Sequence, residues 1–312
     1  MCASWRESTK KQYQVYLNRW EKFARGKGIN MYFAKVEYVL EFLRELFDDS
    51  CLSYSAINTA RSALASIMTL RDTMHTLGSH PLISRFMRGV FNLRPPVPRY
   101  RRIWDVKVVL DYLRKLSPAG RLSLKDLTQK LTMLIALVSA QRIQTFHLFH
   151  LDNIVFANDS ATISISDLLK HSKPGRIGHQ VQLKAYAQDK RLCVVRYLKK
   201  YIERTQSIRG TERFLLLCYK KPYHRASKDT IARWIKNILQ VSGIDTRSFK
   251  SHSTRAAATS AAKRAEVPIK DIMSQAGWSN ESTFNKFYNK PVDQVESRFS
   301  VAVLGNKTNA HH

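Results

Sequence analysis

The sequence predicts a mainly α-helical protein with one small β-hairpin, divided into a helical N-terminal domain and a larger α+β C-terminal domain. Three observations lead to this prediction. Apolar residues recur at three- and four-residue spacing over most of the chain, one region alternates polar and apolar residues, and a proline-rich segment interrupts the helical pattern. A length of 312 residues is about twice that of a usual domain, which agrees with two hydrophobic cores.

Apolar stripes at helical spacing mark four helices in the N-terminal part. They lie at residues 5–23, 36–46, 57–67 and 82–91. The segment NLRPPVPRYRR then brings three prolines and four arginines into eleven residues. Because proline cannot continue a helix and stiffens the chain, a basic linker is predicted over residues 93–103.

The C-terminal part is predicted to contain both helices and a hairpin. Helical spacing indicates helices over about 105–117, 124–141, 190–204 and 228–241, and a further one in HSTRAAATSAAKRA. ATISIS (161–166) and HQVQL (179–183) alternate as half-buried strands do, and the proline and glycines between them predict a turn. Two short helices are expected at the end, separated by Gly277, the second capped by Ser279 and carrying Tyr288.

The charge balance indicates a polyanionic partner. Lys and Arg number 52 against 24 Asp and Glu, which leaves a net charge of +28 and a pI near 10.2. The basic residues recur along the whole chain, and nucleic acid is the commonest partner of such a fold. No apolar run approaches the roughly 18 residues of a membrane span, and no signal-peptide pattern opens the sequence.

The four cysteines are scattered and form no CxxC pair, which argues against a zinc ribbon or a disulfide framework. A reducing, intracellular location fits this pattern. The short run PRYRR is compatible with a nuclear signal, although a solvated basic loop explains it equally well. The expectation is therefore an intracellular protein, located in the nucleus.

Motifs for metal or nucleotide chemistry are missing from the sequence. It has no GxxxxGK[ST] loop, no GxGxxG after a strand, no HExxH and no cluster of carboxylates. We therefore expect no metal and no cofactor. Attack on a phosphodiester without metal needs a nucleophile, cations that neutralise the phosphate oxygens, and an acid for the leaving 5′ oxygen. Arginine suits the cationic role because its planar fork donates two charge-assisted bonds, whereas lysine or histidine suits proton transfer.

Two cations in the first half of the C-terminal part are candidates for these roles. Arg142 stands at the end of the predicted helix LTMLIALVSAQR, and Lys170 lies where the first predicted strand enters its turn. Each also has a plain structural interpretation, as a helix-end surface arginine and a solvated turn lysine.

Four more candidates follow in HSTR and in GWSNESTFNKFY. HSTR supplies His252 and Arg255, a spacing that chance alone would produce about once in this chain. Trp278 follows Arg255 by 23 residues, and Tyr288 follows Trp278 by ten. His252 could simply begin a helix, and the two aromatic residues could belong to the core. The occurrence of all these residues in one order favours the catalytic interpretation.

This series resembles the active site of the tyrosine recombinases, the phage-integrase family. HPLISRFMRGVFNLRPPVPRY, QRIQT, HSTRAAATS and WSNESTFNKFYNKP resemble, more narrowly, the recombinase of DIRS-like retrotransposons. The resemblance covers almost the whole chain. It implies a helical core-binding domain over residues 1–92 and a catalytic domain over residues 104–291. Residues 292–312 would form a tail that either packs on its own domain or docks on a neighbouring protomer.

The resemblance also implies roles for the basic residues. Arg142 and Arg255 would clamp the scissile phosphate, and His252 would assist as an acid or base. Lys170 would be the general acid toward the 5′ oxygen, with Lys173 as the alternative.

The aromatic residues and the linker receive roles in the same way. Trp278 would donate its indole N–H to a phosphate oxygen, and Tyr288 would attack to form a 3′-phosphotyrosine. Thr145 stands where an acidic residue commonly supports the first arginine, and the spacing from Trp278 to Tyr288 is one residue longer than usual. Further DNA-binding candidates are Arg99, Arg101, Arg102, Lys173 and Arg176.

By resemblance, the expected function is integration of a circular DNA copy of a retrotransposon, by a metal- and ATP-independent recombinase. It would act on double-stranded DNA as a homo-oligomer, a tetramer in the synapse. Two alternatives are a DNA-relaxing enzyme of the type IB topoisomerase kind and a catalytically silent, domesticated DNA-binding protein. The complete set of candidate residues argues against the silent protein.

Overall fold

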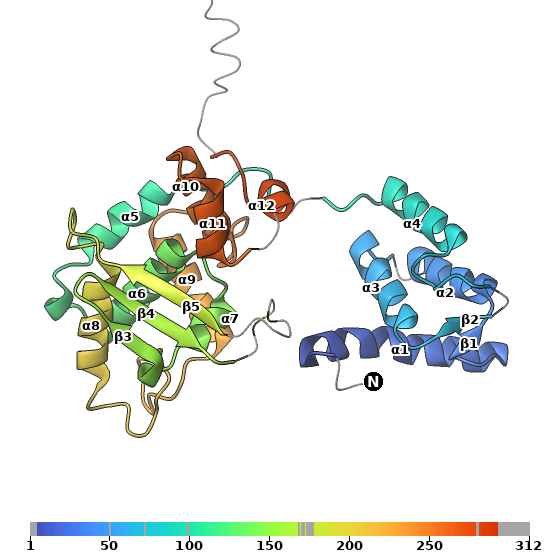
Figure 1. Ribbon diagram of the computed structural model, residues 1–312, viewed down its shortest axis with the longest axis horizontal. Helices are drawn as coiled ribbons and strands as arrows, with labels where there is room; N and C mark the ends of the chain where they lie inside the picture. The colour runs from blue at the N-terminus through green and yellow to red at the C-terminus, as the bar shows by residue number, and fades with distance from the viewer. Residues whose placement is uncertain are drawn as a thin grey trace, which may run out of the picture. The chain divides into compact units, whose positions relative to one another are not determined.

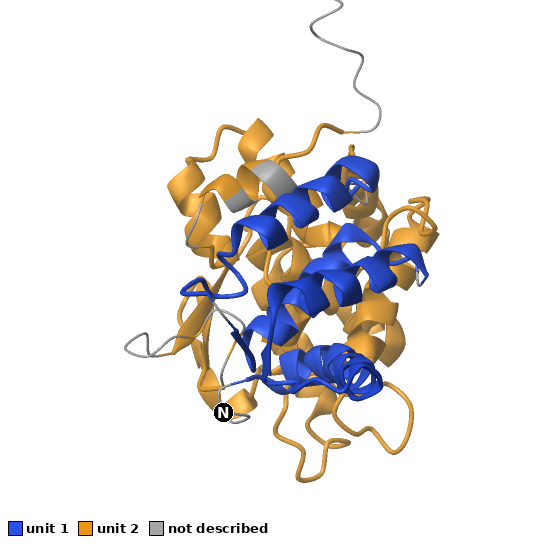
Figure 2. Cartoon of the chain, turned by 90° about the vertical axis from the view of Figure 1, so that its right-hand side faces the viewer, with its two compact units in different colours: residues 1–98 blue, residues 99–312 orange. Residues whose placement is uncertain are grey.

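The structure, a computed structural model, describes residues 5–49, 51–71, 73–97, 100–167, 169, 172, 178–278 and 281–292, without the side chains of residues 283, 286 and 287. The chain divides into two compact units, residues 1–98 and residues 99–312 (Figures 1 and 2). Each unit has a hydrophobic core of its own.

Unit 1 consists mainly of four helices whose apolar faces enclose its core. They are α1 (Glu7–Lys27), α2 (Val36–Asp48), α3 (Tyr54–Ala65) and α4 (Pro81–Leu93). Trp20 of α1 is fully buried, and its ring packs against Phe23 and Phe42. Its Nε1 donates to the carbonyl of Met31 at 2.8 Å, so the polar atom of this large side chain is satisfied inside the core.

The prediction of an all-helical N-terminal part was wrong in one detail. Strand β1 (Phe33–Ala34) pairs in parallel with strand β2 (Thr69–Leu70). Each strand has only two residues, which is too short for an alternating pattern to be visible in the sequence.

Unit 2 packs its helices around a small sheet and a central helix (Figure 1). The helices are α5 (Val106–Lys115), α6 (Leu124–Ser139), α7 (Ile143–His147), α8 (Val194–Thr205), α9 (Lys228–Val241), α10 (Ser253–Arg264), α11 (Ile269–Ala276) and α12 (Glu281–Phe287), with short 3₁₀ turns η2 (Ala119–Arg121) and η3 (Leu151–Asn153). Helix α6 contacts α8, α9, α10 and strand β5 (His179–Lys184), and it is buried on nearly all sides. Its apolar residues therefore form the middle of the unit 2 core.

The sheet of unit 2 has three antiparallel strands in the order β3, β4, β5, where β3 is Ile154–Phe156 and β4 is Ser160–Ile165. Ile163 lies opposite Val181, and both are buried against the core. The predicted pairing of two alternating strands is therefore confirmed, as is the mainly helical fold class with a small sheet. The third strand, β3, was not predicted.

Two helix boundaries differ from the prediction. Helix α6 ends at Ser139, because Ala140 takes a left-handed conformation with φ of 49°. Arg142 is consequently the residue before the unpredicted helix α7, and not the end of α6. Helix α8 begins at Val194 instead of residue 190, after a turn in which Asp189 accepts a hydrogen bond from the backbone of Arg191.

Short polar side chains and glycines set several helix ends, as expected from their chemistry. Ser53, Ser123 and Ser227 each accept a hydrogen bond from a backbone N–H in the first turn of their helices. Gly28 and Gly277 end α1 and α11 with φ of 63° and 68°, values that favour glycine. Ser279, the expected cap of α12, lies outside the described residues.

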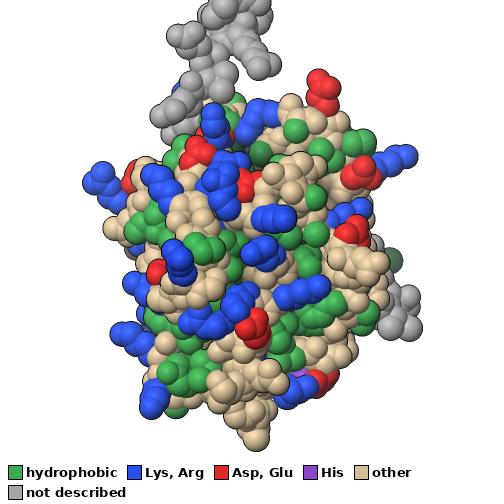
Figure 3. Space-filling model, turned by 90° about the vertical axis from the view of Figure 1, so that its left-hand side faces the viewer, with side chains coloured by type: hydrophobic (Ala, Val, Ile, Leu, Met, Phe, Trp, Pro, Cys, Tyr) green, Lys and Arg blue, Asp and Glu red, His purple; other side chains and the backbone are tan. Residues whose placement is uncertain are grey.

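The charge of the chain is visible on the surface of unit 2. Figure 3 shows Lys and Arg side chains spread over the side on which α8 lies, and they outnumber the acidic side chains between them. The basic side chains on such a face repel one another, and together they attract polyanions.

Candidate active site

Arg255 is the structural centre of the candidate site. It lies in the first turn of α10 with 2% of its surface exposed. Its two Nη atoms donate to the carbonyls of Ala140 and Ala276, each at 2.8 Å. Ala140 directly follows α6, and Ala276 is the last residue of α11. The carbonyls at the C-terminal end of a helix lack partners within the helix and carry partial negative charge. One guanidinium thus joins three segments that are far apart in the sequence.

Arg255 is nevertheless incompletely satisfied. Its Nε is buried without a hydrogen-bond partner among the described residues. Burial, and secondarily the positive charge of Arg142, lower the pKa of Arg255 to about 10, while the side chain of Tyr288 opposes this shift. At neutral pH the group is still a cation, so the site holds a buried charge beside a second charge of the same sign. An anion placed between them would relieve both the repulsion and the desolvation cost.

Arg142 and His252 border the same space as Arg255. The three residues line one small cavity between the start of α7, the start of α10 and the neighbouring part of α9. Arg142 is half-buried at the N-cap position of α7, and His252 is exposed at the N-cap position of α10. Their positions follow from the two helix boundaries, which direct both residues to this cavity.

Tyr288 and Trp278 complete the cluster from the C-terminal segment. Tyr288 directly follows α12, and its half-buried ring lies 4.5 Å from the ring of Trp278 and 6.3 Å from that of His252, measured between centroids. The guanidinium carbon of Arg255 lies 4.4 Å from the Trp278 ring centroid and 5.5 Å from that of Tyr288. The Tyr288 carbonyl accepts a hydrogen bond of 2.5 Å from Ser260 of α10, which fixes the end of α12 on the helix that carries Arg255.

Three buried polar atoms in this cluster have no partner among the described residues. They are Nε of Arg255, Nε1 of Trp278 and Oγ1 of Thr254. Buried donors are normally paired, because an unpaired one costs about 1–3 kcal/mol. Their convergence around two arginines indicates a site built to hold a ligand with several acceptor oxygens. Thr254 was not singled out from the sequence, although its place within HSTR is a signal that could have identified it.

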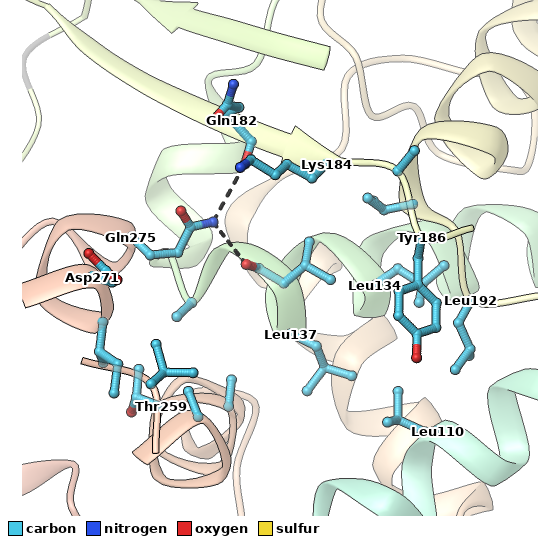
Figure 4. A pocket seen from close by; sticks show the side chains of 18 of the residues that line it. Leu110, Leu134, Leu137, Gln182, Lys184, Tyr186, Leu192, Thr259, Asp271 and Gln275 are labelled. Carbon is cyan, nitrogen blue, oxygen red and sulfur yellow. Dashed lines mark hydrogen bonds between the residues drawn. The ribbon is translucent and has the colours of Figure 1, made fainter. Parts of the chain in front are cut away.

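A pair of glutamines braces the segment that carries Arg142. Gln141, which is 5% exposed, donates from Nε2 to the carbonyl of Gln275 at 2.6 Å and is 3.5 Å from the hydroxyl of Thr145. Gln275 in turn donates to the carbonyl of Val138 at 2.9 Å (Figure 4). By the resemblance, Thr145 stands where an acidic residue commonly supports the first arginine, and in this structure the buried amide of Gln141 braces the segment. Neither glutamine was identified from the sequence, since the pairing depends on contacts between distant segments.

The remaining predicted residues divide into two groups. Arg101 and Arg102 are exposed at the start of unit 2, outside the cluster. The others, Lys170, Lys173, Arg176 and Arg99, lie outside the described residues, so their roles stay predictions. His147 lies outside the cluster, where its Nδ1 is 3.0 Å from the carbonyl of Ala226 and burial lowers its pKa.

Two features are absent from the described residues. No group of three or more His, Cys, Asp and Glu side chains is arranged to hold a metal ion in the described part of the chain. None of the described helices combines the length and the apolar character that crossing a membrane requires.

A separate apolar groove lies beside the cluster in unit 2 (Figure 4). It has a volume of about 670 Å³, and α5, α6, α10, α11 and the end of β5 contribute to its walls. Leu110, Leu134 and Leu137 are among its apolar lining residues, and Asp271 and Gln275 stand on its polar side. Arg142, Arg255 and Tyr288 do not line it, so it is not the candidate active site.

Comparison with known protein sequences gives two matches. The phage integrase family matches residues 107–294, which is more than half of the chain. The integrase/recombinase xerD homolog of Selenomonas ruminantium is 26% identical over 121 residues, a match that covers 38% of this chain and 36% of that protein. The chain therefore spans only about a third of the length of this curated relative.

Several solved structures share the fold at low sequence identity. The Tn1549 transposon integrase in complex with circular intermediate DNA has a TM-score of 0.59 at 14% identity, covering 97% of this chain and 94% of that chain. The XerH site-specific recombinase bound to difH substrate gives 0.56 at 12% identity over 89% and 71% of the two chains. The lambda integrase tetramer bound to a Holliday junction gives 0.55 at 13% identity over 94% and 75%. With a family match that includes all five clustered residues, the chain belongs to the phage integrase family of tyrosine recombinases.

Proposed function

We propose that this protein is an active tyrosine recombinase, which cleaves and rejoins duplex DNA through a 3′-phosphotyrosyl intermediate. The observation that carries the proposal is the cluster around Arg255. There, two arginines, a histidine and a phenol lie together with three buried polar atoms that have no partner among the described residues, one of them the Nε of Arg255 itself. Three segments of the chain contribute these groups, at residue 142, residues 252–255 and residues 278–288. A phosphodiester has the charge and the acceptor oxygens that such a cluster lacks.

The chemistry assigns one task to each group. The Oη of Tyr288 attacks the phosphorus, and its bond to phosphorus forms as the bond to the 5′ oxygen breaks. The phenol proton passes to His252 or to water, and Lys170 or Lys173 supplies the proton that the 5′ oxygen takes up. Arg255 and Arg142 neutralise the phosphate oxygens in the transition state. Because the tyrosyl ester conserves the energy of the broken bond, a 5′ hydroxyl can reverse the reaction and rejoin DNA without ATP.

The covalent intermediate is the direct test. Labelled duplex DNA, nicked so that a short 5′ fragment diffuses away after cleavage, is incubated with the protein in EDTA and analysed on a denaturing gel. A covalent band is expected with the native protein and no band with Tyr288→Phe. A band that persists in the variant would move the nucleophile elsewhere, and tight DNA binding without any band would favour a silent binding protein.

Our finer proposal is that the natural reaction inserts a circular DNA copy of a DIRS-like retrotransposon, in the nucleus. Its support is that four sequence segments resemble the recombinase of DIRS-like retrotransposons, among them QRIQT around Arg142 and HSTRAAATS around Arg255. The test supplies a circle that carries the joined ends of such an element together with a target plasmid. Cointegrate products are expected, whereas relaxation of the plasmid by a monomer, without exchange, would assign a topoisomerase-like activity.

We also propose that protomers assemble on double-stranded DNA, as a tetramer in the synapse. The support is that lambda integrase was captured as a tetramer on a Holliday junction and as a dimer on a core site. The tail predicted over residues 292–312 would link the protomers by placing its apolar residues in the 670 Å³ groove of a neighbour. Val138 lines this groove with 41% of its surface exposed, so Val138→Glu should block assembly on DNA without unfolding the protein. Light scattering of the DNA complex measures this, and unchanged assembly would exclude the groove.

A further inference from the structure

A second groove, on the α8 side of unit 2, is lined by basic residues. It has a volume of about 620 Å³ and lies between η2, the turn after β3, the segment that follows β5, and α8. The basic residues that line it are Lys190, Arg196, Lys199 and Lys200. We call it the α8 groove. In Figure 1, α8 lies at the edge of unit 2 away from α7 and α12, and Figure 3 shows the basic face around it. None of its lining residues belongs to the candidate active site.

Most of the positive charge in the α8 groove is uncompensated. Lys200 pairs with Glu203 at 2.6 Å, and Glu203 is the acidic residue that lines the groove. Within the described part of the chain, no carboxylate lies within salt-bridge distance of Lys190, Arg196 or Lys199. All three side chains are exposed, and residues 196 and 199 stand one turn apart on the same face of α8. Three like charges held along one groove repel each other unless an anion with several charges binds between them.

Aromatic rings are exposed beside these cations. Tyr186 lines both the α8 groove and the apolar groove of Figure 4, and 44% of its surface is exposed. Phe156, at the end of β3, is 39% exposed, and the ammonium of Lys199 lies 5.3 Å from its ring centroid. Rings packed for stability alone are normally buried more completely. Cations that follow a backbone together with rings that stack on bases are the two parts of a site for single-stranded nucleic acid. In a duplex the faces of the bases are covered by their neighbours, so these rings would have no stacking partner.

We propose that the α8 groove binds a single strand of nucleic acid, with its phosphates on Lys190, Arg196 and Lys199 and its bases on Tyr186 and Phe156. This binding is separate from the DNA cleavage proposed above, because it uses a different side of unit 2 and requires no chemistry. Each proposal can therefore fail without the other. The shared chemistry of DNA and RNA strands is sufficient for the groove, and the experiment distinguishes between them.

The first test removes the charges and measures the salt dependence of binding. Fluorescent 20-nucleotide oligo(dT) and oligo(U) are titrated with the full-length protein at several salt concentrations. The triple variant Lys190→Gln, Arg196→Gln, Lys199→Gln should make the negative slope of log K against log[salt] shallower by about 2, because each phosphate of a single strand that a cation neutralises contributes roughly −0.7 to that slope. The matched control Lys228→Gln, Arg233→Gln, Lys236→Gln removes three exposed charges from α9 and should leave the slope unchanged.

The outcomes separate the groove from general electrostatics. A weaker salt dependence confined to the groove variant supports the proposal, and the ratio of the oligo(dT) and oligo(U) affinities tells which sugar the groove prefers. Equal decreases in both variants would mean diffuse attraction and would overturn the proposal. Competition by poly-glutamate as strong as that by oligo(dT) would also overturn it, because the rings would then contribute nothing.

The second test locates the bases. Tyr186→Ala should weaken oligonucleotide binding roughly tenfold, the effect of losing one stacked base. Oligonucleotides that carry 5-bromouracil are then irradiated on the native protein, and the crosslinked peptides are identified by mass spectrometry. Crosslinks at Tyr186 or Phe156 are expected. Crosslinks found only around residues 142, 252 and 288 would place the strand in the candidate active site and overturn the proposal.

Discussion

Arg255 and Lys130 are two of the buried cations in the described part of unit 2, and they differ in how completely their donors are paired. Lys130 of α6 is fully buried, and its ammonium donates to the carbonyls of Leu113 and Leu116 and to the hydroxyl of Tyr197 at 2.6–2.7 Å. All three of its donors are therefore used.

Arg255 keeps an Nε without a partner among the described residues and has a second arginine beside it. An unpaired Nε alone does not identify a binding site, because buried Arg209 has one too. At Arg255 it coincides with a second arginine that lines the same cavity and with the unpartnered Nε1 of Trp278 and Oγ1 of Thr254. The two cations thus separate a structural site from a binding site within one unit, and the following predictions test that separation.

The largest effect is expected from Arg255→Lys. A lysine cannot bond the carbonyls of Ala140 and Ala276 together and still present a planar fork to a phosphate. The rate of covalent complex formation should fall about 10³-fold, the upper range for losing one transition-state donor. Lys130→Met, the matched variant at the structural cation, should keep the native rate, as measured on the nicked duplex. Equal decreases in the two variants would remove the distinction between the sites.

Trp278→Phe tests the unpaired indole N–H with a smaller expected effect. Phenylalanine keeps an aromatic ring against Tyr288 but has no donor, so the cleavage rate should fall about 10²-fold by the same reasoning. Loss of the indole N–H should itself change the free energy of unfolding in urea only a little, because that group has no hydrogen-bond partner among the described residues. A native cleavage rate in this variant would show that the indole N–H does not contact the phosphate.

Thr254→Val should have opposite effects on stability and on DNA affinity. Valine is close in shape to threonine, and the substitution removes a buried hydroxyl that lacks a partner among the described residues. The free energy of unfolding should therefore rise by about 1 kcal/mol. Affinity for duplex DNA should fall several-fold if the hydroxyl bonds a phosphate oxygen. A variant that is less stable than the native protein would show that Thr254 is already satisfied without DNA.

The sequence predicted much of this arrangement because burial imposes periodic patterns. The helix that carries Arg255 was located as the alanine-rich segment HSTRAAATSAAKRA, and the end of α11 just before Trp278 was located from Gly277. The end of α6 was not, since the left-handed Ala140 has no signal in its side chain, and α7 was missed with it. The unpaired donors were also beyond prediction. Whether Trp278 has a partner depends on segments that only the folded chain brings together.

The smallest effect concerns Lys130, whose burial lowers its pKa to about 7, partly opposed by the charge of Asp189. The unfolded lysine titrates at its usual value near 10.4. Between these values the unfolded chain holds a proton that the folded chain has released, so Lys130 makes the protein more stable as pH rises. The contribution is about 1 kcal/mol per pH unit between about pH 7.5 and 9.5. Urea unfolding should therefore show the native protein gaining stability relative to Lys130→Met across this range, on top of a constant difference from the two carbonyls left unpaired. Parallel curves would mean that the three hydrogen bonds hold the ammonium at its ordinary pKa, and that a fully paired cation can be buried here without losing its proton.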